Sequence, residues 1–326
     1  MTIYVEKNNF TRRVIRGKIM SKKDKIKDKD CAEKKAKRRR RLGDRSDGRK
    51  LRTIDPMHRL MPYIMKRRSD AQNTDADSFE ITAVDAFCRA RVKEGMTNFG
   101  FLHVLLAAYV RMVSQRPAVN RFVSGQKIYA RNNIEVVMSV KKHMALDGAD
   151  TMIDVVFEPT DTIYDVYRKF NDVVQQNVGN DDDSSFDTLA KVLNFIPGLF
   201  LRWTVKLLFC LDYFGLLPRF LTKLSPFHGS MIVTSMGSLG IKPIYHHLYD
   251  FGNLPVFLAY GVKRTATTVE KDGSIVRKRY IDLKAVTDER ICDGYYFASA
   301  FKLMKRYVEN PELLTTPPEE VVEDID

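Results

Sequence analysis

The sequence of 326 residues has few of the groups that build disulfides, metal centres or phosphate sites. Its four cysteines, Cys31, Cys88, Cys210 and Cys292, show no paired metal-ligand spacing, so we expect free thiols in a reducing compartment. No Gly-rich phosphate loop and no His/Asp/Glu metal-ligand spacing occur. The sequence therefore predicts no bound metal and no bound cofactor. Without a secretory signal, the expected location is the cytoplasm.

Long uncharged runs are also scarce. The most apolar stretch, residues 191–227, is interrupted by Arg202, Lys206 and Asp212. Its longest uncharged piece has 10 residues, whereas a transmembrane helix needs ~20. Two interpretations remain for this insert. It forms a pair of helices packed on its own body or on another subunit, or it is an amphipathic element that lies on a membrane or covers an acyl tunnel.

Excess positive charge is confined to the beginning of the chain. Residues 1–50 hold 20 Lys/Arg and 7 Asp/Glu, whereas residues 51–326 hold 34 of each. This segment is expected to be a disordered tail. It is a solvated leader or a patch for an anionic membrane surface, which would make the protein peripheral to the membrane. Nucleic acid is a less favoured partner, because no aromatic residue between Lys22 and Arg41 could stack on bases. Met20 is a candidate for the true start.

Residues 51–314 mix strands and helices without regular βαβ alternation, which predicts an α+β two-layer sandwich. Apolar residues at three- and four-residue spacing predict a helix from an Asn98 N-cap to about Ser114. Further helices are expected at 162–174, beginning at Thr162, and at 294–309. The predicted strands are 79–84, a pair within 128–140, 151–158, 231–235, 255–262 and 278–287.

A motif near the end of the chain carries a family resemblance. The stretch Asp288-Glu289-Arg290-Ile291-Cys292-Asp293-Gly294 resembles the Asp-His-Arg-x-x-Asp-Gly signature of dihydrolipoyl acyltransferases, the catalytic cores of 2-oxo acid dehydrogenase complexes. Chloramphenicol acetyltransferase is similar, with His-x-x-x-Asp-Gly. Residues 117–122, 231–240 and 255–261 resemble further segments of the same family, in the same order. The resemblance implies a chloramphenicol acetyltransferase-like fold, with a mixed sheet and packed helices, and a trimer.

The resemblance also implies a chemistry, which one substitution puts in doubt. The family transfers an acyl group from a coenzyme A-type thioester, using the motif histidine as base and a hydroxyl from a neighbouring subunit as oxyanion donor. The base position here is Glu289, and the hydroxyl falls on Thr234, with Ser235 and Ser238 beside it as substrate-binding candidates. A free glutamate has a pKa of ~4.3, against ~6.5 for histidine, so Glu289 is a weak base unless burial raises its pKa.

Two histidines could replace the missing base. His228 precedes the Thr234 strand and His247 follows the turn after it. The simpler interpretation is that both are structural. Likewise, Glu289 could be merely solvated, or paired with Arg290.

The remaining motif residues are expected to support the fold. In the resembled family the aspartate at Asp293 forms an ion pair with an arginine from the N-terminal part of the domain, and Arg67 or Arg68 could supply it. Gly294 then permits a tight turn into the last helix. The acidic residues 315–326 are expected to be disordered. No lipoylation motif is found, so this chain could not act alone as a swinging-arm core.

Two functions are consistent with the sequence. One is an acyltransferase that uses a coenzyme A-type thioester and a thiol, hydroxyl or amine acceptor, with an atypical site. The other is a non-catalytic acyl-CoA-binding or scaffolding homo-oligomer of the same fold.

Overall fold

The computed structural model describes residues 40–141, 150–178 and 195–326. The chain divides into two units at Leu42, and the unit Gly43–Asp326 contains both sheets. Most of the basic tail, the acidic loop around residues 180–185 and the first four residues of the apolar insert lie outside the described residues.

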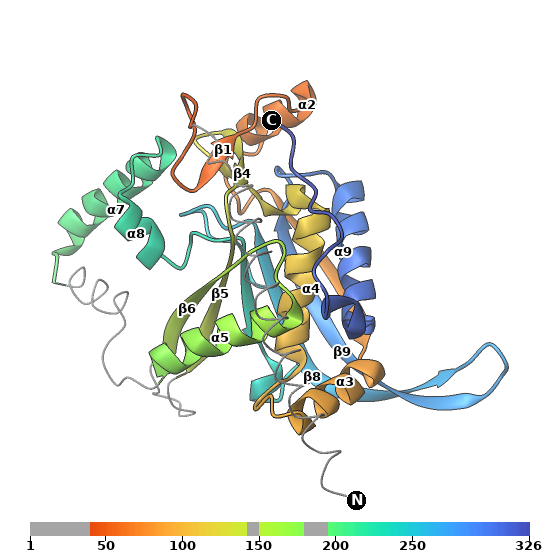
Figure 1. The fold of residues 1–326 in the computed structure, drawn as a ribbon. Helices are drawn as coiled ribbons and strands as arrows, with labels where there is room; N and C mark the ends of the chain where they lie inside the picture. Colours follow the sequence, from red (N-terminus) through yellow and green to blue (C-terminus); the bar gives the residue numbers. More distant parts are fainter. Residues whose placement is uncertain (1–39, 142–149, 179–194) are drawn as a thin grey trace, which may run out of the picture. The chain divides into compact units, whose positions relative to one another are not determined.

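A six-stranded mixed sheet is the centre of this unit (Figure 1). Its middle strands β5, β7 and β8 are parallel, and the outer pairings β5–β6, β8–β9 and β2–β9 are antiparallel. In spatial order the strands are β2 (Gln72–Glu80), β9 (Ile275–Asp288), β8 (Val256–Val269), β7 (Met231–Ser235), β5 (Ile134–Lys141) and β6 (Asp150–Phe157). A second, three-stranded sheet consists of β1 (Gly48–Lys50), β4 (Lys127–Arg131) and β3 (Arg121–Ser124).

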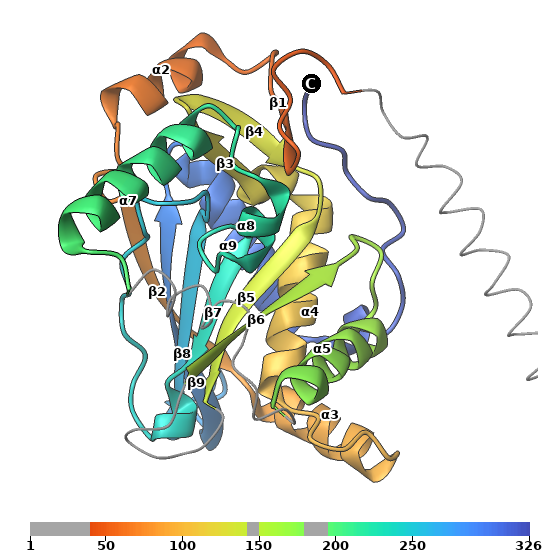
Figure 2. The ribbon, with the colours of Figure 1, turned by 90° about the vertical axis from the view of Figure 1, so that its left-hand side faces the viewer.

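Four helices cover one face of the large sheet (Figures 1 and 2): α3 (Thr82–Lys93), α4 (Phe101–Gln115), α5 (Ile163–Val178) and α9 (Gly294–Glu309). Along β8, the side chains of Val256 and Leu258 join the core under these helices, and Phe257 between them joins a smaller cluster. This alternation follows the two-residue period of a strand. Helix α4 lies between its neighbours, and nearly all its side chains are buried. The predicted α+β two-layer architecture is confirmed.

The remaining helices lie outside this layer. They are α2 (Pro56–Ile64), α7 (Gly198–Tyr213) and α8 (Arg219–Leu224), with short 3-10 turns at Pro117–Asn120, Gly237–Leu239 and Pro311–Leu314. Figure 1 shows α7 and α8 on the side of the sheet away from α4 and α9. Within the described residues, no helix combines the length and apolar character needed to cross a membrane.

Most predicted elements occur where the pattern placed them. Helix α9 has the predicted bounds, and β7 coincides with residues 231–235. Helix α5 begins as predicted, because Thr162 Oγ1 accepts a hydrogen bond from the Asp165 N–H at 3.3 Å. The Asp165 carboxylate in turn accepts from the Thr162 N–H at 3.1 Å, which satisfies two N–H groups at once. Helices also form in the described part of the insert.

Two strand predictions were wrong in detail. The strand expected at 79–84 ends at Glu80, and Thr82 begins helix α3. The apolar residues Phe79, Ile81 and Val84 suggested a single strand. Phe79 is buried in β2, whereas Ile81 and Val84 are buried at the start of α3. The segments within 128–140 are both strands but do not pair with each other. Strand β4 belongs to the small sheet and β5 to the large one.

The start of α4 also differs from the prediction. Asn98 adopts a φ of 61° in the turn before the helix, and Gly100 is the N-cap of α4. The Gly100 N–H donates to His103 Nδ1 at 3.1 Å. His103 is buried and its ring stacks on Phe99 at 5.2 Å between centroids. His103 therefore helps to fix the beginning of the central helix.

Both ends of the folded unit extend further than predicted. Residues 43–50 belong to it, because Arg45 is buried and β1 pairs with β4. The acidic residues at the other end are ordered, which corrects the expectation of disorder. Asp324 forms an ion pair with Arg121, with Nε–Oδ2 at 2.8 Å, and the N–H of Val322 donates to the Ser114 carbonyl. The carboxylates are therefore tied to the body by cations.

Asp324→Asn is expected to lower the free energy of unfolding by about 2–3 kcal/mol, because the Arg121 cation would lose its carboxylate in a site where both side chains are largely buried. The side chains of Asp324 and Arg121 are 7% and 12% exposed. Urea denaturation followed by circular dichroism measures the change. Glu323→Gln alters an exposed neighbour and should change the value by less than about 0.5 kcal/mol. Equal effects of the two substitutions would contradict a structural role for the ion pair.

Candidate active site

The motif loop is built around a buried carboxylate at the end of β9. Asp288 is 0% exposed and lies between two guanidinium groups. The Arg290 guanidinium donates to it twice, at 2.8 and 2.7 Å, and the Arg68 guanidinium donates once, at 3.3 Å. Burial lowers the pKa of Arg68, and the Asp288 charge opposes this. A buried ion group of this kind is stable only when every member has its partners.

Both arginines also hold neighbouring segments. They donate to three backbone carbonyls in two segments: Arg68 donates to Tyr249 at 2.6 Å and to Gly252 at 3.0 Å, and Arg290 donates to Met65 at 3.1 Å. The Asp288 N–H donates to the Pro255 carbonyl at 2.9 Å. The backbone of the motif is therefore fixed against two loops and the start of β8.

Glu289 is the exposed member of this fixed loop. Its N–H donates to the Ala71 carbonyl at 2.9 Å, while its side chain faces solvent in the single chain. Its backbone is fixed, and its carboxylate forms no hydrogen bond or ion pair among the described residues. No described histidine is bonded to Glu289, so the replacement of the motif histidine has no visible substitute at this position.

The expected ion pair of Asp293 is not formed. Asp293 is exposed, and its carboxylate accepts the Tyr296 N–H at 2.7 Å, which makes it the N-cap of α9. Gly294 is the first residue of that helix. Arg68, one of the two expected partners, binds Asp288 instead, and Arg67 is exposed. The helix N–H groups offer Asp293 bonds that require no burial of charge.

The hydroxyl candidates lie on and after β7. Thr234 and Ser235 are half-buried at the end of this strand, and Ser238 is exposed in the 3-10 turn that follows, where its Oγ donates to the Ser235 carbonyl at 2.8 Å. Thr234 is on the face of the sheet opposite the helices, because its neighbour Val233 belongs to the core under them. Its hydroxyl is therefore outside the main core.

Thr234 and Glu289 do not meet within one chain. Thr234 is opposite Ala259 on β8, and Ala259 is opposite Lys284 on β9. Glu289 is five residues beyond Lys284, which corresponds to about 16 Å along the strand, plus two strand spacings of about 4.8 Å across the sheet. A site that contains both side chains therefore requires two copies of the chain.

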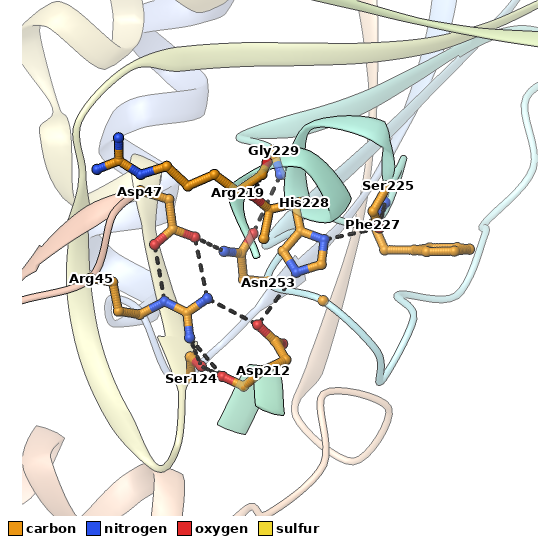
Figure 3. Close-up of polar contacts among 12 residues, drawn as sticks. Arg45, Asp47, Ser124, Asp212, Arg219, Ser225, Phe227, His228, Gly229 and Asn253 are labelled. Carbon is orange, nitrogen blue, oxygen red and sulfur yellow. Dashed lines mark hydrogen bonds and ion pairs between the residues drawn. The ribbon is translucent and has the colours of Figure 1, made fainter. Parts of the chain in front are cut away.

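His228 is buried in a polar cluster and is not available as a base (Figure 3). Its Nε2 is 3.4 Å from Asp212 Oδ1 and its Nδ1 is 2.9 Å from Ser225 Oγ. Asp212, near the end of α7, also accepts from Arg45 at 2.9 Å. Burial alone would raise the pKa of Asp212, but His228 and Arg45 hold that pKa below its ordinary value.

The same cluster joins the beginning of the unit to the loop before β8. Arg45 also donates to Asp47 at 3.0 Å and to Ser124 at 2.7 Å, and Asn253 donates to Asp47 at 2.7 Å. Burial would raise the pKa of Asp47, but the Arg45 charge lowers it overall. No local pattern in the sequence indicates this cluster, because Arg45 and Asp212 are 167 residues apart. Its arrangement is structural.

His247 is exposed and lies on the sheet face opposite the helices. The neighbouring His246 ring stacks on Phe257 at 4.2 Å, and its Nδ1 is 2.8 Å from the His247 carbonyl. The His247 ring is 5.0 Å from that of Tyr249. Neither contact brings an acid or a nucleophile to His247, so the structure does not unite it with Thr234 or Glu289.

A hollow of about 420 Å³ adjoins the motif loop. Four cationic side chains line it, together with Asp212 and Asp250: Lys66, Arg67, Arg68 and Arg290. Asp250 already accepts bonds from the Ser69 N–H and hydroxyl, and Asp212 is paired within the buried cluster. The exposed cations Lys66 and Arg67 therefore make this wall attractive to an anionic group.

Comparisons with known proteins decide the fold. The dihydrolipoamide acetyltransferase of Azotobacter vinelandii is similar, with a TM-score of 0.51 and 13% identity over 81% of this chain and 93% of that chain. The chain has the chloramphenicol acetyltransferase-like fold. A probable dihydrolipoamide acetyltransferase from Listeria monocytogenes aligns with a TM-score of 0.48 and 16% identity, over 80% of this chain and 95% of that chain. A chloramphenicol acetyltransferase aligns with a TM-score of 0.49 and 11% identity, over 79% of this chain and 99% of that chain.

No protein-family model matches the chain, and no curated protein matches it. At these identities the structural likeness establishes the fold alone, and the activity has to be argued from the site.

Proposed function

We propose that this protein is an acyltransferase that moves an acyl group from a coenzyme A-type thioester to a thiol, hydroxyl or amine acceptor, at a site shared between two copies of the chain. The observation that carries the proposal is the position of Glu289. Its backbone is held by a buried Arg68–Asp288–Arg290 group while its carboxylate is left exposed. Such a costly support beneath a free side chain is typical of a functional position.

The separation of Thr234 from Glu289 supports the shared site. Each chain carries both groups, and an oligomer that brings the β7 end of one copy to the motif loop of the next would complete a site. A packed neighbour would also remove water from Glu289, and burial raises the pKa of a carboxyl group. That change is what this weak base needs.

The chemistry requires one proton transfer in each direction. Glu289 accepts the proton of the acceptor, whose S, O or N forms a bond to the thioester carbonyl carbon. The Thr234 hydroxyl donates to the oxyanion of the tetrahedral intermediate. The bond from that carbon to the coenzyme A sulfur then breaks, and the proton held by Glu289 passes to the departing thiolate. No net charge is created on the protein.

The cationic hollow supports a donor with phosphate groups. Lys66 and Arg67 are exposed on its wall, and neither forms an ion pair among the described residues. A coenzyme A thioester carries several phosphate charges at a distance from its reacting carbonyl. An anion site next to the motif loop would therefore leave the carbonyl free to reach Glu289.

Glu289→Gln is expected to lower kcat/KM by about 10²–10⁴-fold, the range for loss of a general base. Thr234→Val should lower it by about 10²–10³-fold, the range for one oxyanion donor. Chromatographic separation of free coenzyme A from acetyl-CoA and longer acyl-CoAs measures turnover, with dihydrolipoamide and simple alcohols as acceptors. Glu319→Gln, at another exposed glutamate, is the matched control and should be unchanged. Glu289→His should retain or increase turnover.

Mixing the two inactive variants tests the shared site. In randomly mixed oligomers about one quarter of the sites would contain both native groups, so about one quarter of the wild-type rate should return. Recovery cannot occur if each chain holds a complete site. An inactive wild type whose Glu289→His variant is active would show that the fold has lost its base, and the proposal of a working Glu289 would be wrong.

A non-catalytic binding role is the second candidate, favoured by the exposure of Glu289 in the single chain. In that case wild type, Glu289→Gln and Glu289→His would all be inert while acyl-CoA still bound. Calorimetric titration with acetyl-CoA separates the two functions, because binding without turnover in every variant is expected only of a binding module.

A further inference from the structure

Helix α7 and the segment after it expose large apolar side chains to solvent. Each of the following is at least 57% exposed: Phe195, Leu199, Phe200, Trp203, Leu207, Phe214, Leu216 and Phe220. Isolated exposed apolar residues are ordinary, but a contiguous group of this size marks a contact surface.

The exposed group forms one arc of the helix. Leu199, Trp203 and Leu207 follow one another at four-residue spacing, and Phe200 continues the same side. Leu201, Thr204, Leu208 and Asp212, at similar spacing, are half-buried or buried against the body. The helix is therefore attached along one narrow stripe and presents the opposite stripe outward.

Every exposed charge in this region is positive. Residues 195–227 contain four cations, Arg202, Lys206, Arg219 and Lys223, and all four are exposed. The single acid, Asp212, is 7% exposed and paired with Arg45. Lys206 Nζ lies 5.1 Å from the Trp203 ring, so cations flank the apolar arc directly. An apolar stripe of Trp, Phe and Leu beside Lys and Arg is the composition of a helix that lies in a membrane interface.

The attachment of α7 prevents the arc from turning inward. Asp212 is fixed by Arg45 and His228, Tyr213 Oη donates to Gln126 at 2.8 Å, and the Phe209 ring contacts Phe251 at 5.0 Å. These contacts hold the end of the helix in one orientation. Among the described residues no segment covers the apolar arc, so it is open to a partner outside this part of the chain.

We propose that this surface, α7 with Phe214, Leu216 and Phe220, docks on a lipid bilayer with anionic head groups. The apolar arc would enter the head-group boundary while Arg202 and Lys206 bind phosphate or carboxylate groups of the lipids. A second copy of this chain fits the surface less well, because a two-fold contact would place like charges together and because lysine is depleted in interface cores. This inference does not depend on acyl transfer.

Trp203 makes the test direct, because it is the only tryptophan of the chain and is 64% exposed. On addition of vesicles of phosphatidylcholine and phosphatidylglycerol at three to one, its fluorescence should shift to shorter wavelength and become quenched by brominated acyl chains. Acrylamide quenching should fall. Pure phosphatidylcholine vesicles should produce a weaker response. Binding through the basic residues 1–41 alone would leave the Trp203 signal unchanged, so the two modes of attachment are distinguished.

Substitution of the arc gives the second measurement. Leu199→Ser with Leu207→Ser should lower the vesicle partition coefficient by about tenfold for each leucine, from the transfer free energy of that side chain. Val269→Ser with Ile275→Ser is the matched control, since both residues are at least 67% exposed in the distant β8–β9 hairpin. It should leave partitioning unchanged.

Two results would overturn the proposal. One is vesicle binding with no change in Trp203 emission and equal binding by the Leu199/Leu207 variant. The other is a Trp203 that is already shielded from acrylamide in lipid-free protein and becomes accessible on dilution to monomer, which would show that a second copy covers the arc.

Discussion

Asp288→Asn is expected to lower the free energy of unfolding by about 3–5 kcal/mol, the loss typical of one partner removed from a buried ion group. The native carboxylate accepts from two fully buried guanidinium groups, Arg68 and Arg290. The amide has no charge to offset them, and its NH₂ group would face a donor. Both cations would stay buried without a counter-charge, because the carbonyls that they also bind carry only partial charge.

Urea denaturation measures this loss, and the motif supplies its own control. Asp293→Asn makes the same chemical change five residues later, at an exposed N-cap where asparagine serves as well as aspartate. It should cost less than about 0.5 kcal/mol. A small effect of Asp288→Asn as well would mean that the carbonyls alone satisfy Arg68 and Arg290, and that the motif loop is held by its backbone bonds.

The same contrast explains what the sequence could and could not predict. Helix α9 and strand β7 were placed correctly because their signals are local: Asp293 and Gly294 begin the helix, Asn310 and Pro311 end it, and an apolar run marks the strand. The fold was predictable from the order of the family motifs. Glu289 in place of the motif histidine did not obscure it, because the residues that support the loop do not depend on the side chain at this position.

The partners of the site residues were not predictable in this way. Asp288 and Asp293 belong to the same seven-residue motif, and only the three-dimensional structure shows that the first binds Arg68 while the second caps a helix. The pairing of Arg45 with Asp212 spans 167 residues and has no local pattern. Thr234 and Glu289 lie at positions that one chain cannot unite. Such contacts depend on which distant segments pack together. The local spacing of apolar residues does not specify this packing.

The buried cluster around Arg45 gives the second large effect. Arg45→Met removes the cation that binds both Asp47 and Asp212, two carboxylates that are themselves largely buried. At pH 7 the free energy of unfolding should fall by about 3–5 kcal/mol, because both charges lose their main partner. His228 and Asn253 still donate to the two carboxylates, which limits the loss.

The loss should depend on pH with a definite sign. In the native protein the pKa values of Asp47 and Asp212 are lowered: burial would raise both, but Arg45 outweighs it at Asp47, and His228 together with Arg45 outweighs it at Asp212. Their contribution to stability is therefore complete above the unfolded pKa of ~3.9 and disappears as the pH falls through the folded values. Without Arg45 both pKa values should rise, and that of Asp212 should rise less, because it keeps His228. The deficit of the variant should thus be largest near pH 7, begin to shrink as the pH falls through the raised pKa values of the variant, and shrink further until the pH passes the lowered values of the native protein.

Urea midpoints between pH 3 and pH 8 test this expectation. Arg168→Met is the matched control, because Arg168 is 65% exposed and its pair with Asp165 lies on the surface of α5. That change should cost less than about 1 kcal/mol at every pH. A deficit for Arg45→Met that stayed constant over this range would indicate lost packing of its side chain against Phe122. A loss of stability that shrinks in acid would instead show that the cost comes from two unpaired carboxylates. It would also show that these ion pairs attach α7 to the body.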